Sequence, residues 1–191
     1  LPSSGAYSSH LIRDGAGYSV FASQSNGLNQ QLNLFAAPDA PVKIVHLRLK
    51  NLWKRSRRIT VTYFAEWVLG ITRENSQTHI IPEFEPDKNA LLASNHFTTE
   101  FGNRVAFLAA NKKIHGLTAD RTEFLGRLGT MRLPAALGRI GLASTVRAGQ
   151  DPCAAIQLHV DLAPGQEEAV YFLLGEGSNR EESLALIGEY Q

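Results

Sequence analysis

The 191-residue sequence has few sulfur-containing residues: one cysteine, Cys153, and one methionine, Met131. A single cysteine excludes an internal disulfide, which is compatible with a reducing compartment. We expect Cys153 to be a small buried side chain and not a nucleophile. No stretch approaches the roughly 20 apolar residues of a membrane span, and Leu1–Gly5 lacks the features of a signal peptide. Without an initiator methionine, we expect a soluble piece of a longer chain.

An excess of charge of one sign is also lacking. The 19 basic and 18 acidic residues leave a formal net charge of +1. Such a chain has no field to attract nucleic acid or an anionic membrane, so we expect no nucleic-acid partner. Its length is sufficient for one domain whose core needs neither disulfides nor metals.

The motifs of common catalytic sites are absent. The six histidines form no His-x-x-x-His pair and there is no Cys-x-x-Cys, so we predict neither a metal site nor a cofactor. A Gly-x-Ser-x-Gly elbow and a Walker-type loop are missing too. Asp14–Gly17 is glycine-rich, but it leads into an expected strand and therefore predicts a tight turn, not a phosphate-binding loop.

Period-two alternation of apolar and polar residues dominates the sequence. It is clearest over residues 45–49, 59–67 and 156–162, and it places one set of side chains in a core. Turn residues such as Asn26-Gly27 and Pro164-Gly165 separate the segments. Further strands are expected over residues 18–21, 30–35, 79–84, 90–94, 104–109 and 169–174. The pattern predicts an all-β antiparallel sandwich over residues 1–177.

One helix is expected, at the end of the sequence. Ser178 and Glu181 have the spacing of a capping box, and Leu184, Ile187 and Tyr190 follow at helical spacing. We therefore predict that residues 178–191 begin a helix that links the sandwich to a further domain.

The least regular segment, residues 112–149, contains the strongest candidate site. Asp120, Arg121, Glu123, Phe124 and Arg127 bring charge and an aromatic ring together beside glycine. A guanidinium offers a planar fork of donors, and carboxylates accept from sugar hydroxyls. These five residues are our candidate substrate-binding residues. A structural ion pair is an equal alternative for the same charges.

Other charged residues have simpler interpretations. Glu83 and Glu85 lie two apart and could share a strand face, as paired glycosidic carboxyl groups would need. Exposed solubilising carboxylates explain them, and Glu66, more simply. The run Lys54–Arg58 predicts a solvated hairpin turn, with docking on an acidic neighbour as the alternative.

An ordered series of segments resembles one known family. The segments are Asp14-Gly-Ala-Gly-Tyr-Ser-Val-Phe21, Lys43–Asn51, Val61–Gly70, Glu100–Phe107, Asp120-Arg-Thr-Glu-Phe-Leu-Gly126 and Asp151–Ala155. Together they cover nearly the whole chain and resemble the N-terminal β-sandwich of the phosphorylase-like region of cyclic β-1,2-glucan synthases. That region belongs to glycoside hydrolase family 94, formerly glycosyltransferase family 36. Asp14 stands where the family usually has His.

The resemblance implies a galactose-mutarotase-like supersandwich of two large antiparallel sheets, followed through a linker helix by an (α/α)6 barrel. The family's catalytic residues lie in that barrel, so none is assigned here. Asp120–Gly126 matches a family segment that we expect to approach the barrel's sugar site, in the same or a neighbouring subunit. Implied partners are the barrel, a β-glucan oligosaccharide and a second subunit. The implied parent is a bacterial inner-membrane protein with this region on the cytoplasmic side.

Three functions follow from the sequence. The first is a non-catalytic domain that scaffolds and partly covers the active site of a β-glucan synthase or phosphorylase. The second is an independent carbohydrate-binding module that stacks sugars on Trp53, Phe97 or Phe101. The third, a complete mutarotase-like enzyme, would need His79, His115 and Glu83 to face one pocket.

Overall fold

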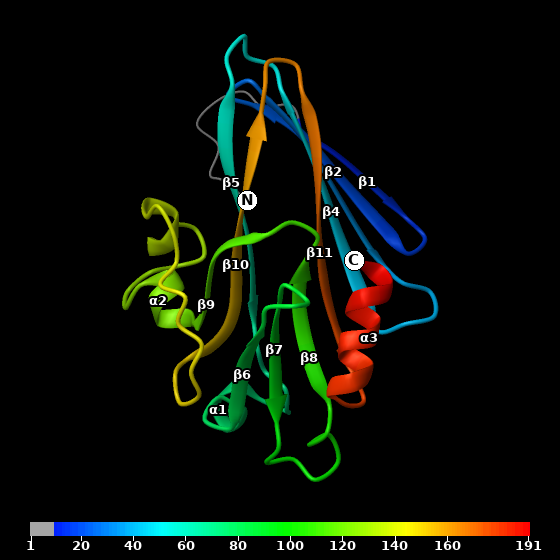
Figure 1. Ribbon diagram of the computed structural model, residues 1–191, viewed down its shortest axis with the longest axis vertical. Helices are drawn as coiled ribbons and strands as arrows, with labels where there is room; N and C mark the ends of the chain where they lie inside the picture. Colours follow the sequence, from blue (N-terminus) through cyan, green and yellow to red (C-terminus); the bar gives the residue numbers. More distant parts are fainter. Residues whose placement is uncertain (1–9) are drawn as a thin grey trace.

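Two antiparallel β-sheets pack against each other in the computed structural model, which describes residues 10–191 (Figure 1). Leu1–Gly5 lies outside the described residues. The larger sheet has the strand order β1-β2-β3-β4-β11-β8-β7-β6, and the smaller has the order β5-β10-β9. The predicted all-β antiparallel sandwich is confirmed, with only three strands in the second sheet over the described residues.

The strands are β1 (His10–Gly15), β2 (Tyr18–Ser25), β3 (Leu28–Ala36), β4 (Val42–Asn51), β5 (Arg57–Glu66), β6 (Ile80–Glu85), β7 (Ala90–Asn95), β8 (Val105–Ala110), β9 (Ile114–Asp120), β10 (Pro152–Leu162) and β11 (Glu167–Gly177). The helices are α1 (Arg73–Ser76), α2 (Arg121–Leu125) and α3 (Arg180–Tyr190), with a 3-10 turn at Ala135–Gly138. No helix among these is both long and apolar enough to cross a membrane.

The alternation of apolar and polar residues in the sequence correctly predicted which strand side chains are buried in the core. Val45 and Leu49 of β4 are buried while Arg48 between them is exposed, and Ile156 and Leu158 of β10 face them in the same apolar cluster. The expected Asn26-Gly27 turn is present. Both residues have positive φ, 49° and 68°, as the tight turn between twisted strands requires.

Strand β1 and the short helices α1 and α2 were not predicted from the sequence, and neither was strand β9. It lies in the segment regarded as least regular, and Gly116 weakens its strand pattern. The glycine is required by packing, because a Cβ there would lie 2.9 Å from the backbone nitrogen of Leu142. The pairing of β9 with β10 also shifts register beside Gly116, at Gln157 and Leu158.

Helix α3 covers the outer face of the larger sheet, where Ile187 packs with Phe107 and Leu173. The helix was expected, but its cap lies one residue later than predicted. Asn179 is the N-cap and accepts from the Glu182 backbone N–H at 2.9 Å. The Glu182 carboxylate accepts from the backbone N–H of Ser178 at 2.7 Å and from its hydroxyl. Glu182, not Glu181, is therefore the acid that closes this turn.

The Asn51 side chain ties the two sheets together at one end of the smaller sheet. It is fully buried, and its Nδ2 lies 2.8, 3.1 and 3.2 Å from the carbonyl oxygens of Arg55, Leu162 and Ala163. Its Oδ1 accepts from the Trp53 backbone N–H at 3.0 Å. One amide thus fixes both the β4–β5 and the β10–β11 connections, which run between the sheets.

We expect Asn51→Ala to lower the free energy of unfolding by about 3 kcal/mol, because several buried carbonyl groups lose a donor together. Urea unfolding of the chain would measure the loss. Asn29→Ala, an exposed position on β3, is the matched control and should change stability by less than about 0.5 kcal/mol. Equal effects of the two substitutions would show that Asn51 is not a structural tie.

The hydrogen bonds from the hydroxyl and then the backbone N–H of Ser178 lower the pKa of Glu182 below its ordinary value. We expect Ser178→Ala to raise this pKa, as measured by NMR titration of the Glu182 carboxyl. Because the pKa of Glu182 is lower in the folded state, its ionised carboxylate stabilises the fold at pH values above the unfolded-state pKa. This stabilisation is lost as the pH falls through the folded-state pKa. Ser56→Ala, at an exposed serine, should leave the Glu182 titration unchanged; a shift there would contradict this assignment.

Candidate functional site

The candidate segment Asp120–Arg127 lies on the outer face of the smaller sheet. Phe124 and Leu125 of α2 are buried there with Ala155 of β10. The Phe124 ring stacks on Phe64 of β5, with centroids 4.4 Å apart and planes 12° apart. Phe124 is only 3% exposed, so its side chain anchors the segment and cannot contact a sugar in this conformation.

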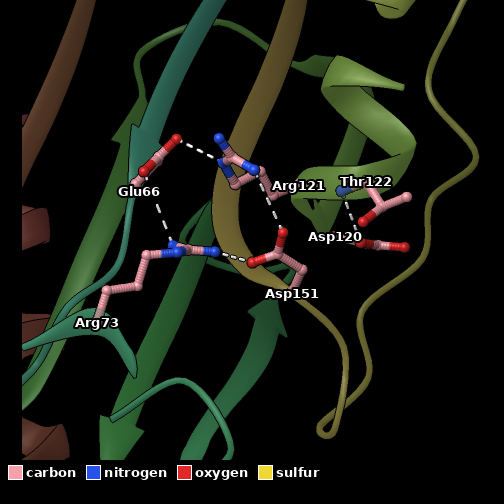
Figure 2. Close-up of polar contacts among 6 residues, drawn as sticks. All are labelled: Glu66, Arg73, Asp120, Arg121, Thr122 and Asp151. Carbon is pink, nitrogen blue, oxygen red and sulfur yellow. Dashed lines mark hydrogen bonds and ion pairs between the residues drawn. The ribbon is translucent and has the colours of Figure 1, made fainter. Parts of the chain in front are cut away.

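Asp120 holds the start of α2. It ends β9 in extended conformation, and its Oδ1 accepts from the Thr122 backbone N–H at 2.9 Å (Figure 2). Asp is a favoured N-cap because its carboxylate satisfies an amide that the first helical turn leaves free. Asp120 therefore sets the direction in which the following side chains leave the sheet.

Arg121 takes part in a closed ring of four charges (Figure 2). Its Nε donates to Glu66 Oε1 at 2.6 Å, and its Nη1 lies 3.5 Å from Asp151 Oδ2. Arg73 completes the ring, 3.7 Å from Glu66 Oε2 and in contact with Asp151. Each guanidinium lies between two carboxylates, so the four charges cancel and each is stabilised by two neighbours.

This ring joins residues from four elements: the end of β5, the start of α1, the start of α2 and the residue before β10. Its side chains are 21–35% exposed, so solvent screens them in part, although a network retains more than an isolated surface pair. The structural ion pair that the sequence left open for Arg121 is thus present. It leaves Nη2 of Arg121 without a hydrogen bond to any residue of 10–191.

The remaining two candidates differ in environment. Glu123 accepts from Arg139 Nη1 at 2.7 Å and is only 14% exposed at its side chain. It therefore fastens the 3-10 turn to α2. Arg127 is exposed and makes no ion pair with another described residue. It is the candidate whose whole guanidinium is open to a ligand.

Arg73, Asp151 and Arg139 were not predicted from the sequence as parts of this site, and Glu66 was interpreted there as a solubilising carboxylate in preference to a glycosidic one. Ion pairs that span 30 or 55 residues leave no spacing signal in a sequence. The one available hint was composition, because Asp151 directly precedes a strongly apolar strand.

The other candidate residues lie in separate environments. Glu83 and Glu85 share a strand face as expected, and both accept from Arg180 Nη2, at 2.7 and 2.6 Å. His115 stacks on His159 at 3.6 Å between centroids. His79 stacks on Phe97 instead. The histidines and the acid proposed for a mutarotase-like pocket are therefore each engaged elsewhere.

Two further expectations concern the lone cysteine and metal ligands. Cys153 is buried as predicted, and burial raises its pKa well above the ordinary thiol range, which opposes thiolate chemistry. Within residues 10–191, no group of three or more His, Cys, Asp or Glu side chains is arranged to hold a metal ion.

We expect Arg121→Ala to lower the free energy of unfolding by about 1–2 kcal/mol, because Glu66 and Asp151 each lose a half-buried partner. Combined with Asp151→Ala in a double-mutant cycle, it should show a coupling above about 0.5 kcal/mol. Urea unfolding would supply the four stabilities. Arg127→Ala is the matched control and should change stability by less than about 0.5 kcal/mol. Additive effects of Arg121→Ala and Asp151→Ala would contradict the ring.

Comparison of the sequence with known proteins identifies its family. The model of "Glycosyl hydrolase 94, supersandwich domain" matches residues 1–191. The chain is 32% identical over 178 residues to the cyclic beta-(1,2)-glucan synthase NdvB of Rhizobium meliloti (strain 1021), covering 93% of this chain and 6% of that protein. It is 22% identical over 179 residues to the N,N'-diacetylchitobiose phosphorylase of Vibrio proteolyticus, covering 92% of this chain and 22% of that protein.

A solved structure supports the fold. The GalM/aldose epimerase homologue from C. elegans aligns with a TM-score of 0.55 at 11% identity, covering 90% of this chain and 69% of that one. This likeness confirms the galactose-mutarotase-like fold and speaks to fold alone. The chain spans only 6% and 22% of the lengths of the two curated relatives.

Proposed function

The chain belongs to the glycosyl hydrolase 94 supersandwich family, and from this premise we propose that it is the non-catalytic sandwich of a larger β-glucan synthase or phosphorylase, of the cyclic β-1,2-glucan synthase type. In this function it scaffolds the catalytic (α/α)6 barrel and covers part of its active site. We propose the bacterial inner membrane as the location of the parent enzyme, with this domain on the cytoplasmic side.

One observation carries the proposal. The segment between α2 and β10, here called the covering layer, packs on β10 and exposes apolar side chains to solvent. Of the 15 large hydrophobic residues that are exposed among the described residues, five lie in residues 128–140: Leu128, Met131, Leu133, Leu137 and Ile140. Such a concentration is typical of a surface that contacts another protein domain. The covering layer contains four arginines and no acidic residue between residues 124 and 150. The surface of the domain that it contacts should therefore be acidic in part.

The position of α3 bears on which subunit supplies that surface. Helix α3 lies on the outer face of the larger sheet, whereas α2 lies on the outer face of the smaller one (Figure 1). The expected link to the barrel and the candidate segment are thus on opposite faces of the sandwich. This arrangement favours contact of Asp120–Arg127 with the barrel of a neighbouring subunit in a homodimer.

Within the segment, the proposed roles follow from burial and pairing. Arg127 donates to hydroxyl groups of the glucan acceptor because its guanidinium is open. Arg121 adds a donor through Nη2, the nitrogen that the ring of charges leaves free. Asp120 caps α2 and Glu123 fastens the 3-10 turn to that helix through Arg139, and the Phe124–Phe64 stack fixes the segment on the sheet.

We expect Arg127→Ala in the full-length enzyme to raise the KM for the glucan acceptor about tenfold, a loss of about 1.4 kcal/mol of binding. The value of kcat should change less, because the chemistry lies in the barrel. Steady-state kinetics with varied acceptor would measure both constants. Arg121→Ala should act in the same direction.

Arg13→Ala, an exposed arginine on β1, is the matched control and should leave both constants unchanged. If Arg121→Ala and Arg127→Ala also leave acceptor KM and kcat unchanged, Asp120–Arg127 has no part in acceptor binding and the proposed covering role fails.

A further inference from the structure

A cleft of 710 Å³ opens at the end of the sandwich where β7 and β8 are connected. One wall is the connection between β5 and α1, and the other is the loop from Asn95 to Arg104. No residue of 112–150 lines it, so it is separate from the candidate segment Asp120–Arg127. Its size falls in the range of pockets that hold small ligands.

Two phenylalanines present their rings at this cleft. Phe97 is 70% exposed and Phe101 is 50% exposed, although apolar rings of this size normally contribute to a core. The Phe97 ring stacks on His79 with centroids 3.9 Å apart and planes 6° apart, which orients it and leaves its opposite face open. The cleft therefore contains an open aromatic platform held in a fixed position.

The walls of the cleft are held together by a buried amide. Asn95 is 4% exposed; its Nδ2 donates to the Leu69 carbonyl at 2.8 Å and its Oδ1 accepts from the Phe97 backbone N–H at 3.1 Å. Leu69 has φ +38°, a conformation that a bulky residue rarely adopts. Strain of this kind persists where the surrounding contacts impose it, and it is concentrated at binding sites.

The polar groups of the cleft favour a neutral ligand that carries hydroxyl groups. Arg104 Nη1 lies 2.5 Å from Glu176 Oε1, and both side chains are nearly half exposed, at 45% and 43%. Glu100 adds a second carboxylate, so two acids and one base leave the cleft with a formal charge of −1. This charge opposes uronates and phosphates, whereas the carboxylates can accept from hydroxyl groups and the guanidinium can donate to them.

We propose that this cleft is a second carbohydrate site, which binds a neutral glucan oligosaccharide. A pyranose ring has an apolar C–H face that packs on an aromatic ring and a rim of hydroxyl groups that need donors and acceptors. The aromatic surface for the C–H face is supplied by Phe97 and Phe101. The donors and acceptors for the hydroxyl groups are supplied by Arg104, Glu176 and Glu100. The choice of glucose as the sugar rests on the proposed function.

Trp53, the third aromatic residue considered for stacking, does not offer such a surface. Arg55 and Arg57 lie over its ring, at 4.5 and 4.0 Å from the centroid. The ring also packs against Gly27, where a Cβ would collide with it. At the cleft, the Arg104 guanidinium lies 5.7 Å from the Phe101 centroid, so Phe97 is the more open of the two rings there.

The test is a calorimetric titration of the 191-residue chain with a short linear β-1,2-glucan oligosaccharide. The chain should bind it saturably, and Phe97→Ala and Phe101→Ala should each weaken binding about tenfold. Phe97→Trp, which retains a ring, should retain binding. Tyr18→Ala, at an aromatic residue 51% exposed on β2, should bind as the unchanged chain does. Thermal unfolding of each variant would confirm that it is folded.

The absence of saturable binding would overturn the proposal, as would binding that Phe97→Ala and Phe101→Ala leave unchanged. Arg127→Ala separates this site from the proposed function, because it should leave the titration unchanged while it alters the acceptor kinetics of the full-length enzyme. Loss of binding in Arg127→Ala alone would assign the sugar to Asp120–Arg127 and would remove the cleft from consideration.

Discussion

The structure depends on the burial of β10 on both of its faces. Ala154, Ile156 and Leu158 point into the core between the sheets, while Cys153 and Ala155 point to the opposite face and are equally buried. An apolar face of a sheet must be covered, since its exposure would forgo roughly 25 cal/mol for each Å² of apolar surface. The long segment between β9 and β10 provides that cover. Its irregular course follows from this need and not from an absence of structure.

The smaller sheet is fastened by polar groups at its two ends. Arg57 and Leu162 pair at the end where Asn51 connects the loops, and Glu66 and Cys153 pair at the end where the ring of charges lies. The two fastenings differ in strength. The Asn51 amide is fully buried and satisfied by several backbone groups, whereas the ring is partly open to water, which screens its charges.

The proposed function depends on the side chains that these contacts leave available to a ligand. The ring of charges engages most of Arg121, and the Phe124–Phe64 stack removes the aromatic ring from the surface, so Arg127 and one nitrogen of Arg121 remain for a ligand. At the end of the sandwich, the Asn95 amide instead holds a loop that keeps Phe97 exposed. Two surfaces with different chemistry therefore coexist: an arginine-rich apolar layer suited to a protein neighbour, and an open aromatic cleft suited to a sugar.

The alternating strands, the Asn26-Gly27 turn, the terminal helix, the burial of Cys153 and the family could all be predicted from the sequence, because local pattern and ordered motifs are properties of the chain. The sequence did not reveal β1, α1, α2 or β9, and Gly116 of β9 is explained only by the close approach of Leu142. The predicted cap of α3, Ser178, lies one residue before the observed cap, Asn179, since both are good capping residues. The partners of Arg121 and the cleft at Phe97 depend on tertiary contacts, because ion pairs and cavities join residues whose separation along the chain carries no signal.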